Sequence, residues 1–140
     1  MRHFVKFRKS AWLGCFLVAM ALAVGCSKGP PMGEVTGTIT VNGELAPAGA
    51  ISFFPLGGKG GTAGTSIEDG KYTAQVPVGK VKVEIRVSKV VGRKKLYNTP
   101  NSPIQPIMQE VLPAKYNNQT ELVLEVQSGT NQKDYDLKTN

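Results

Sequence analysis

Apolar and polar side chains alternate with a period of two along most of the chain beyond residue 33. The clearest run, KVKVEIRV at residues 80–87, places Val81, Val83, Ile85 and Val87 on one side and charged residues on the other. Successive side chains of a strand point to opposite faces, so this run predicts a strand between a core and solvent. The same pattern predicts further strands at residues 34–41, 50–55, 62–67, 71–76, 121–126 and 133–138.

Short turn sequences separate these runs. Asn42-Gly43 and Glu68-Asp69-Gly70 contain residues that tolerate a positive φ angle, as tight turns require. Seven short strands with turns between them and no helical pattern predict an all-β fold. We expect a seven-stranded antiparallel sandwich with Greek-key connections.

One long stretch breaks the alternation. Residues 88–110 contain Pro100, Pro103 and Pro106, and prolines at this density disfavour both a helix and a central strand. We therefore expect a long loop, a feature that in compact domains is usually functional or disordered. Its basic triplet, Arg93, Lys94 and Lys95, is suited to anionic lipid headgroups or to polyanionic sugars. The alternative is a flexible, solvated insertion.

The first 25 residues follow a third pattern. Four basic residues and no acidic ones occupy positions 1–10, and positions 11–25 are uncharged and largely apolar. As a helix this second segment would be about 22 Å long, which is short for a membrane span and typical of a signal-peptide core. Ala23 and Gly25 lie three residues and one residue before Cys26. We predict cleavage between Gly25 and Cys26.

A cysteine directly after such a site resembles the lipobox of bacterial lipoproteins. That resemblance implies that the Cys26 thiol receives a diacylglycerol and that the new amino terminus is acylated, for example with palmitate. Several acyl chains hold a protein to a bilayer far better than one. Ser27 follows the cysteine, and a residue other than Asp there implies the outer membrane in a cell with two membranes. The alternative is a chance cysteine in a secreted chain.

Removal of residues 1–25 changes the composition of the working protein. The formal charge of +7 falls to about +3, because four of the 17 basic residues are removed, and this disfavours nucleic acid as a partner. The single His and Cys15 are removed as well. Without them the chain can form neither a Ser-His-Asp triad nor a Cys-His pair nor a His-ligated zinc site. We expect no metal, no cofactor and no catalytic residue.

The carboxylates leave one enzymatic alternative open. A glycosidase needs only two of them, and the candidates are Glu34, Glu68, Asp69, Asp134 and Asp136. However, turn chemistry explains the pair at 68 and 69, and the pair at 134 and 136 falls on the outer face of a predicted strand. We therefore do not expect an enzyme, and a hydrolase is the least favoured hypothesis.

Three motifs in a fixed order suggest a known family. They are V-x-G-x-I-x-V-N-G from Val35, D-G-x-Y from Asp69 and P-x-G-x-V-x-V from Pro77. Together they resemble the carboxypeptidase regulatory-like, transthyretin-like β-sandwich. With the lipobox in front and LPAKYN, ELVLEV and YDLK behind, the chain is similar to small lipoproteins of planctomycete-type bacteria. The resemblance implies an accessory or structural domain and supplies no catalytic residue.

The expected organisation follows from these patterns. Residues 1–25 form a lipoprotein signal peptide, residues 26–33 a lipidated cysteine with a Gly/Pro tether, and residues 34–138 the β-sandwich. The leading hypothesis is a non-catalytic, lipid-anchored protein with a structural or binding role in the cell envelope. The alternative is a module that binds an envelope polysaccharide or a protein through the basic residues of the 88–110 loop.

Overall fold

The computed structural model describes residues 29–58 and 60–139, and nearly all of the regular structure in this part of the chain is β-strand. Its single helical element among the described residues is the short 3-10 turn η1. The prediction of an all-β fold is confirmed. The elements in chain order are β1 Met32–Val41, β2 Glu44–Leu45, β3 Ala48–Pro55, β4 Ala63–Glu68, β5 Lys71–Pro77, β6 Gly79–Lys95, β7 Ile104–Glu110, η1 Ala114–Tyr116, β8 Val123–Val126, β9 Gly129–Gln132 and β10 Tyr135–Leu137.

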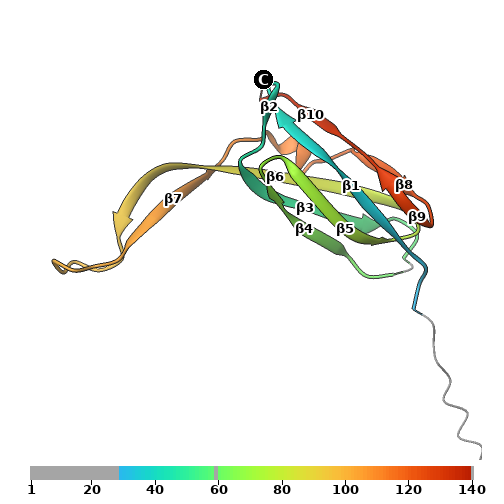
Figure 1. The fold of residues 1–140 in the computed structure, drawn as a ribbon, viewed down its shortest axis with the longest axis horizontal. Coiled ribbons are helices and arrows are strands. Elements are labelled where there is room, and N and C mark those ends of the chain that lie inside the picture. The colour runs from blue at the N-terminus through green and yellow to red at the C-terminus, as the bar shows by residue number, and fades with distance from the viewer. Residues whose placement is uncertain (1–28, 59, 140) are drawn as a thin grey trace, which may run out of the picture.

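The strands form one curled sheet (Figure 1), in the order β10-β1-β5-β4-β3-β6-β7, with β2 and β9 also paired to β1 and β8 paired to β6. Each of the seven predicted strands overlaps an observed one, and β2, β7 and β9 are additional. Most pairs are antiparallel as expected, but β1 pairs with β9 and β10 in parallel. The sheet is therefore antiparallel, as expected, except where β1 pairs with β9 and β10.

The chain passes from β9 to β10 beside the middle of β1. Strands β9 and β10 run in the same direction along β1 and are separated only by Lys133 and Asp134. At this break the Lys133 backbone N–H donates to the Thr36 carbonyl over 2.9 Å. The Lys133 carbonyl comes so close to Gly37 that a Cβ there would lie 1.9 Å from its oxygen. A glycine in β1 thus makes room for the crossing.

The expectation of a long loop at residues 88–110 is wrong. Strand β6 continues to Lys95, and its outer part pairs antiparallel with β7, so the segment is a hairpin that projects from the body (Figure 1). Pro106 is tolerated in β7 because this strand pairs only with β6, and an edge strand need not donate every N–H. Pro100 and Pro103 fall in the tip between the strands. We call residues 88–110 the arm.

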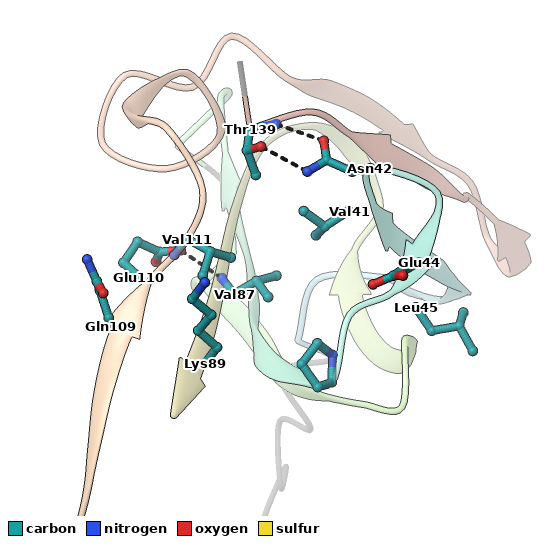
Figure 2. Close-up of a pocket in the computed structure, with 11 residues that line it drawn as sticks. Val41, Asn42, Glu44, Leu45, Val87, Lys89, Gln109, Glu110, Val111 and Thr139 are labelled. Carbon is teal, nitrogen blue, oxygen red and sulfur yellow. Dashed lines mark hydrogen bonds between the residues drawn. The ribbon is translucent and has the colours of Figure 1, made fainter. Parts of the chain in front are cut away.

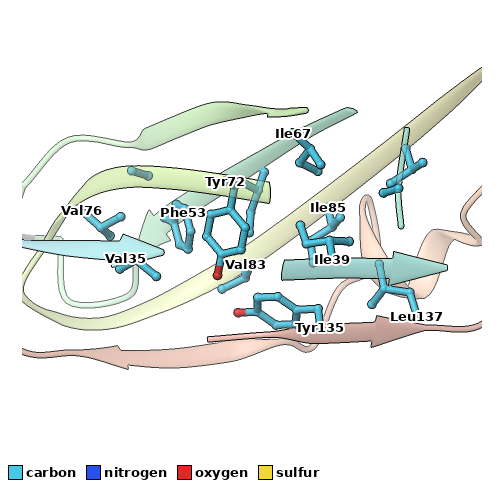
Figure 3. Close-up of a cluster of buried hydrophobic side chains, with 14 of the residues drawn as sticks. Val35, Ile39, Phe53, Ile67, Tyr72, Val76, Val83, Ile85, Tyr135 and Leu137 are labelled. Carbon is cyan, nitrogen blue, oxygen red and sulfur yellow. The ribbon is translucent and has the colours of Figure 1, made fainter. Parts of the chain in front are cut away.

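The core lies inside the curl and consists of the alternating residues that the pattern predicts (Figure 3). The four inward residues of β6 between Val81 and Val87 are at most 1% exposed, and so are Ile51 and Phe53 of β3. Seventeen buried side chains of the described residues form a single cluster, and none of them belongs to the arm. Burial of this apolar surface is the main force that holds the domain together.

The predicted tight turns are also confirmed. Asn42 and Gly43 have φ angles of 54° and 88°, and Asp69 and Gly70 have 49° and 75°. Positive φ at both central residues is the geometry of the turn that matches the twist of a β-hairpin. These turns join β1 to β2 and β4 to β5.

Two tyrosines lie side by side in the core. The rings of Tyr72 and Tyr135 are 6.5 Å apart, and Figure 3 shows both among the aliphatic side chains. The Tyr72 hydroxyl donates to the Lys133 carbonyl over 2.6 Å, whereas the Tyr135 hydroxyl has no partner among the described residues. Burial raises the pKa of Tyr135 to about 12. Burial, with Tyr135 and Asp134 nearby, raises the pKa of Tyr72 well above its usual value.

Candidate functional site

The predicted basic residues lie on the outer half of the arm. Arg93, Lys94 and Lys95 are the last three residues of β6, and all three side chains are exposed. They pair with Pro106, Gln105 and Ile104 of β7. The structure therefore brings the triplet together on a paired ribbon rather than on a loop.

A β-bulge determines which of these cations share a face. The pairing passes from Val90↔Met108 directly to Gly92↔Ile107, so Val91 is an extra residue in β6. Beyond the bulge the alternation resumes with shifted parity, which puts Arg93 and Lys95 on the same face as Val90. Residues directly opposite in an antiparallel pair share a face.

The register therefore divides the arm into two unlike faces. One, which we call the apolar-basic face, carries Val90, Arg93, Lys95, Ile104, Pro106 and Met108. The other, which we call the polar face, carries Lys89, Lys94, Gln105, Ile107 and Gln109.

The arm is unusually apolar for an exposed ribbon. Among the described residues, seven of the eleven large apolar side chains that face solvent belong to it. On the apolar-basic face Ile104 is 64% exposed, Val90 53% and Met108 49%. Apolar residues gathered on one projecting element, rather than scattered singly, indicate an interaction surface.

The charge of the arm has one sign over most of its length. Residues 89–109 contain four basic residues and no acidic one. The only carboxylate of the arm is Glu110, at its base. The arm is thus both cationic and apolar.

The tip is closed by hydrogen bonds of its own backbone. The Leu96 N–H donates to the Pro103 carbonyl over 2.9 Å, and the Tyr97 N–H donates to the Ser102 hydroxyl over 2.7 Å. The side chains of Leu96 and Tyr97 remain exposed. They extend the apolar surface of Ile104 to the end of the arm.

Where the arm joins the body, Glu110 secures it. One carboxylate oxygen of Glu110, Oε1, accepts the backbone N–H groups of Val87, Val111 and Leu112, each over 3.0 Å. Val87 is the last core residue of β6, and Glu110 is the last residue of β7. This single side chain therefore bridges the strand that leaves the body and the chain that returns to it.

A hollow of about 550 Å³ lies beside this junction (Figure 2). Asn42 and Thr139 line it and join β1 to the C-terminal segment through hydrogen bonds of 2.8 and 3.2 Å. Lys89, Glu44 and the apolar Leu45 also line it. The hollow is open and of mixed polarity, and it contains no convergent set of reactive groups.

The candidate carboxylates of a hydrolase are held by neighbouring strands. The Thr38 N–H donates to Asp134 over 2.7 Å, and the Thr40 hydroxyl donates to Asp136 over 3.0 Å. Asp136 also pairs with Lys138 at 3.0 Å, and hydrogen bonds from Lys138 and Thr40 lower the pKa of Asp136. Asp136 therefore links β10 to β1, and Asp134 links the residue just before β10 to the same strand.

The remaining carboxylates lie elsewhere on the surface. Glu34 accepts a long hydrogen bond from Gln75 at 3.4 Å, Glu68 accepts one from Ser66 at 3.4 Å, and Asp69 is a turn residue with positive φ. Within residues 29–58 and 60–139, no three Asp, Glu, His or Cys side chains are grouped closely enough to hold a metal ion.

The predicted cleavage and lipidation residues, Gly25 and Cys26, lie outside the described residues. The apolar segment 11–25 does too. Across the part of the chain that the structure does describe, no helix is long and apolar enough to cross a membrane.

Sequence reasoning identified the basic triplet but missed the apolar-basic face around it. The signal was incomplete, because Gln105 separates Ile104 from Pro106 but the apolar Ile107 separates Pro106 from Met108, and three nearby prolines obscured it further. No protein-family model matches the chain, and neither a curated protein nor a solved structure is detectably similar to it.

Proposed function

We propose that the protein is a lipid-anchored, non-catalytic component of the cell envelope, and that its β domain presents the arm for binding. The main support for this proposal is the arm, a hairpin that projects from the body and adds no side chain to the core. An exposed element that the fold does not need for its stability is a candidate for recognition.

The position of the tether relative to the arm supports the proposal. The Val78 N–H donates to the Pro31 carbonyl over 2.8 Å, so the start of the domain lies beside the start of β6. Strand β6 then runs for 17 residues, or about 55 Å at 3.3 Å per residue. A lipid on Cys26 would hold one end of the domain, and the arm would extend from the other (Figure 1).

The contacts of the carboxylates support a non-catalytic role. Asp134 and Asp136 bind groups of β1, and the turn residue Asp69 is followed by Gly70 in a tight hairpin. These contacts give Asp134 and Asp136 a structural task, and Asp69 serves as a turn residue. A hydrolase remains the least favoured hypothesis.

The finer family assignment is likewise part of the proposal. Its basis is the order of the three motifs, now placed on β1 with its turn, on the β4–β5 turn, and on the β5–β6 connection. These positions are consistent with a transthyretin-like, carboxypeptidase regulatory-like sandwich with Greek-key connections and with a planctomycete-type lipoprotein. Ser27 favours the outer membrane if the source has two membranes.

Intact mass after expression in a lipoprotein-processing bacterium tests the anchoring. We expect loss of residues 1–25 and an added acyl mass on the native chain, which should fractionate with membranes. The Cys26→Ser variant should carry no acyl mass. An unacylated native chain in the soluble fraction would show that Cys26 is incidental and that the protein is secreted.

The alternative function is binding of an acidic polysaccharide or a protein by the arm. The four cations of the arm favour it, because no acidic residue occurs between positions 89 and 109. Replacing Arg93, Lys94 and Lys95 with Ser should abolish retention on a polysaccharide column. Unchanged retention would remove this alternative.

A further inference from the structure

We propose that the arm is a membrane-binding finger whose apolar-basic face contacts an anionic lipid surface. The inference rests on the binding role proposed for the arm, but it does not depend on acylation of Cys26. It gives the molecule a second lipid contact, at the end far from the tether.

The charge of the arm matches such a surface. Lys89, Arg93, Lys94 and Lys95 are exposed, and no acidic residue occurs between positions 89 and 109. Each Lys or Arg held at an anionic leaflet strengthens binding by about fivefold at ordinary ionic strength. Arg93 and Lys95 on the apolar-basic face would contact the leaflet directly, and Lys89 and Lys94 on the polar face would add a longer-range, salt-sensitive attraction.

The apolar side chains favour a lipid partner over a sugar partner. Val90, Ile104 and Met108 share a face with Arg93 and Lys95, and about half or more of each apolar side chain is exposed. A highly charged, hydrated polysaccharide offers no apolar region to cover three aliphatic groups. An anionic bilayer offers headgroups to the cations and acyl chains to the apolar groups at one boundary.

The tip has the composition of an interfacial contact. Tyr97 is 62% exposed, Leu96 46% and Ile104 64%. Tyrosine favours the membrane interface because its ring is apolar and its hydroxyl can remain hydrated. The Leu96 and Tyr97 N–H groups already have partners within the tip. The tip can therefore enter the interface without exposing these donors to lipid.

The unpaired edges of the arm limit how deeply it can enter the bilayer. Beyond residue 87, β6 pairs only with β7, and β7 has no other partner. Unpaired backbone groups are excluded from the hydrocarbon region. The arm should therefore lie at headgroup depth, with only its apolar side chains reaching the acyl boundary.

Vesicle sedimentation tests the proposal on residues 26–140 carrying Cys26→Ser. This chain contains every described strand and the whole core, and it cannot be acylated at residue 26. We expect binding to vesicles of phosphatidylglycerol in phosphatidylcholine, weakened by salt, and little binding to phosphatidylcholine alone. Arg93→Ser with Lys95→Ser should weaken binding by about 30-fold.

Variants on the two faces of the arm test which face contacts the vesicle. Ile104→Ser with Met108→Ser should weaken vesicle binding at least about tenfold, whereas Ile107→Ser on the polar face should change it less than about threefold. Lys80→Ser, on the exposed side of the body at the other end of β6, is the charge control. Thermal unfolding of each variant should match that of the parent, since none of these residues is in the core.

A single tryptophan gives an independent readout, because the only natural one, Trp12, is absent from this chain. Anionic vesicles should blue-shift the emission of Tyr97→Trp and leave that of Gln109→Trp, on the polar face, unchanged. Three results would each overturn the proposal. They are equal binding to neutral and anionic vesicles, an equal loss of binding from substitutions on the two faces, and an unshifted emission of Tyr97→Trp. Tight binding to an acidic polysaccharide that ignores Ile104→Ser and Met108→Ser would overturn it in favour of the polyanion alternative. Failure of any of these tests leaves the intact-mass result for Cys26 unaffected.

Discussion

The Oε1 atom of Glu110 accepts the backbone N–H of Val87 over 3.0 Å, at the point where β6 leaves the body and becomes the arm. The same oxygen also accepts the N–H groups of Val111 and Leu112. A side chain at the end of β7 therefore satisfies donors on both sides of the junction, and it fixes where the arm begins.

Glu110→Ala should loosen this junction. Three backbone donors lose their charged acceptor, and because the site is partly exposed to water we expect a loss of about 1 kcal/mol in the free energy of unfolding. The Val87 amide should also exchange its hydrogen faster. Chemical denaturation and hydrogen exchange measure the two effects. Gln109→Ala, at the neighbouring exposed position of β7, should change neither, and equal effects of both substitutions would contradict the assigned role.

The two core tyrosines should respond differently to removal of the hydroxyl. Tyr72→Phe removes the hydrogen bond to the Lys133 carbonyl and should lower the free energy of unfolding by about 1 kcal/mol. Tyr135→Phe removes a buried hydroxyl without a partner among the described residues, so it should be neutral or stabilising by up to about 1 kcal/mol. Urea denaturation compares them. A larger loss from Tyr135→Phe than from Tyr72→Phe would contradict this arrangement.

The same pair should make the domain sensitive to alkali. Burial raises the pKa of Tyr135 from its usual 10.0 to about 12, and the pKa of Tyr72 is raised as well. A folded-state pKa above the unfolded value means that the unfolded chain loses its protons first. Stability should therefore be complete below about pH 10 and fall as the pH rises toward 12.

Urea midpoints measured from neutral to alkaline pH check this dependence. Tyr72→Phe combined with Tyr135→Phe should flatten the decline relative to the parent. Tyr97→Phe, at the exposed tip, should leave it unchanged. A decline that persists in the double variant would assign the alkaline sensitivity to other groups.

Gly37 should be the least replaceable residue of β1. An added Cβ would lie 1.9 Å from the backbone oxygen of Lys133, and neither strand can yield without disturbing the β1 pairings. Gly37→Ala should cost at least about 2 kcal/mol of unfolding free energy. Gly57→Ala, where an added Cβ meets no atom within 4 Å, should stay within about 0.5 kcal/mol. Thermal unfolding of both variants makes the comparison, and equal midpoints would contradict the close crossing.

The body of the fold was predictable because burial itself produces the signal. Val81, Val83, Ile85 and Val87 alternate with charged residues since one face of β6 packs in the core. Positive φ at Asn42 follows equally from local turn chemistry. Where a local rule and a buried face agree, the sequence pattern identifies the strand and its inward residues.

The missed features lack such a signal. Beyond Val87 no core faces β6, so the alternation weakens, and the nearby prolines favoured a loop although Pro106 occupies a strand that pairs on one side only. The parallel crossing depends on Gly37 meeting Lys133, almost a hundred positions away, which no local pattern encodes. The basic triplet could be recognised from the sequence, but which face each of its side chains occupies depends on the bulge at Val91.

If the arm serves recognition rather than stability, the body should fold without it. Replacing residues 90–108 with Asn-Gly would join Lys89 to Gln109, which are already paired, through a two-residue hairpin turn. Because no arm residue belongs to the core cluster, the melting temperature should stay within a few degrees of the parent value.

Such an arm-less chain should unfold cooperatively and should lose binding to phosphatidylglycerol vesicles completely. Circular dichroism melting and vesicle sedimentation on the same preparation measure the two properties. A body that melts far lower would give the arm a structural role, since its removal would then expose part of the core. A stable body that still binds the vesicles would move the lipid contact away from the arm and onto the charged outer row of the sheet.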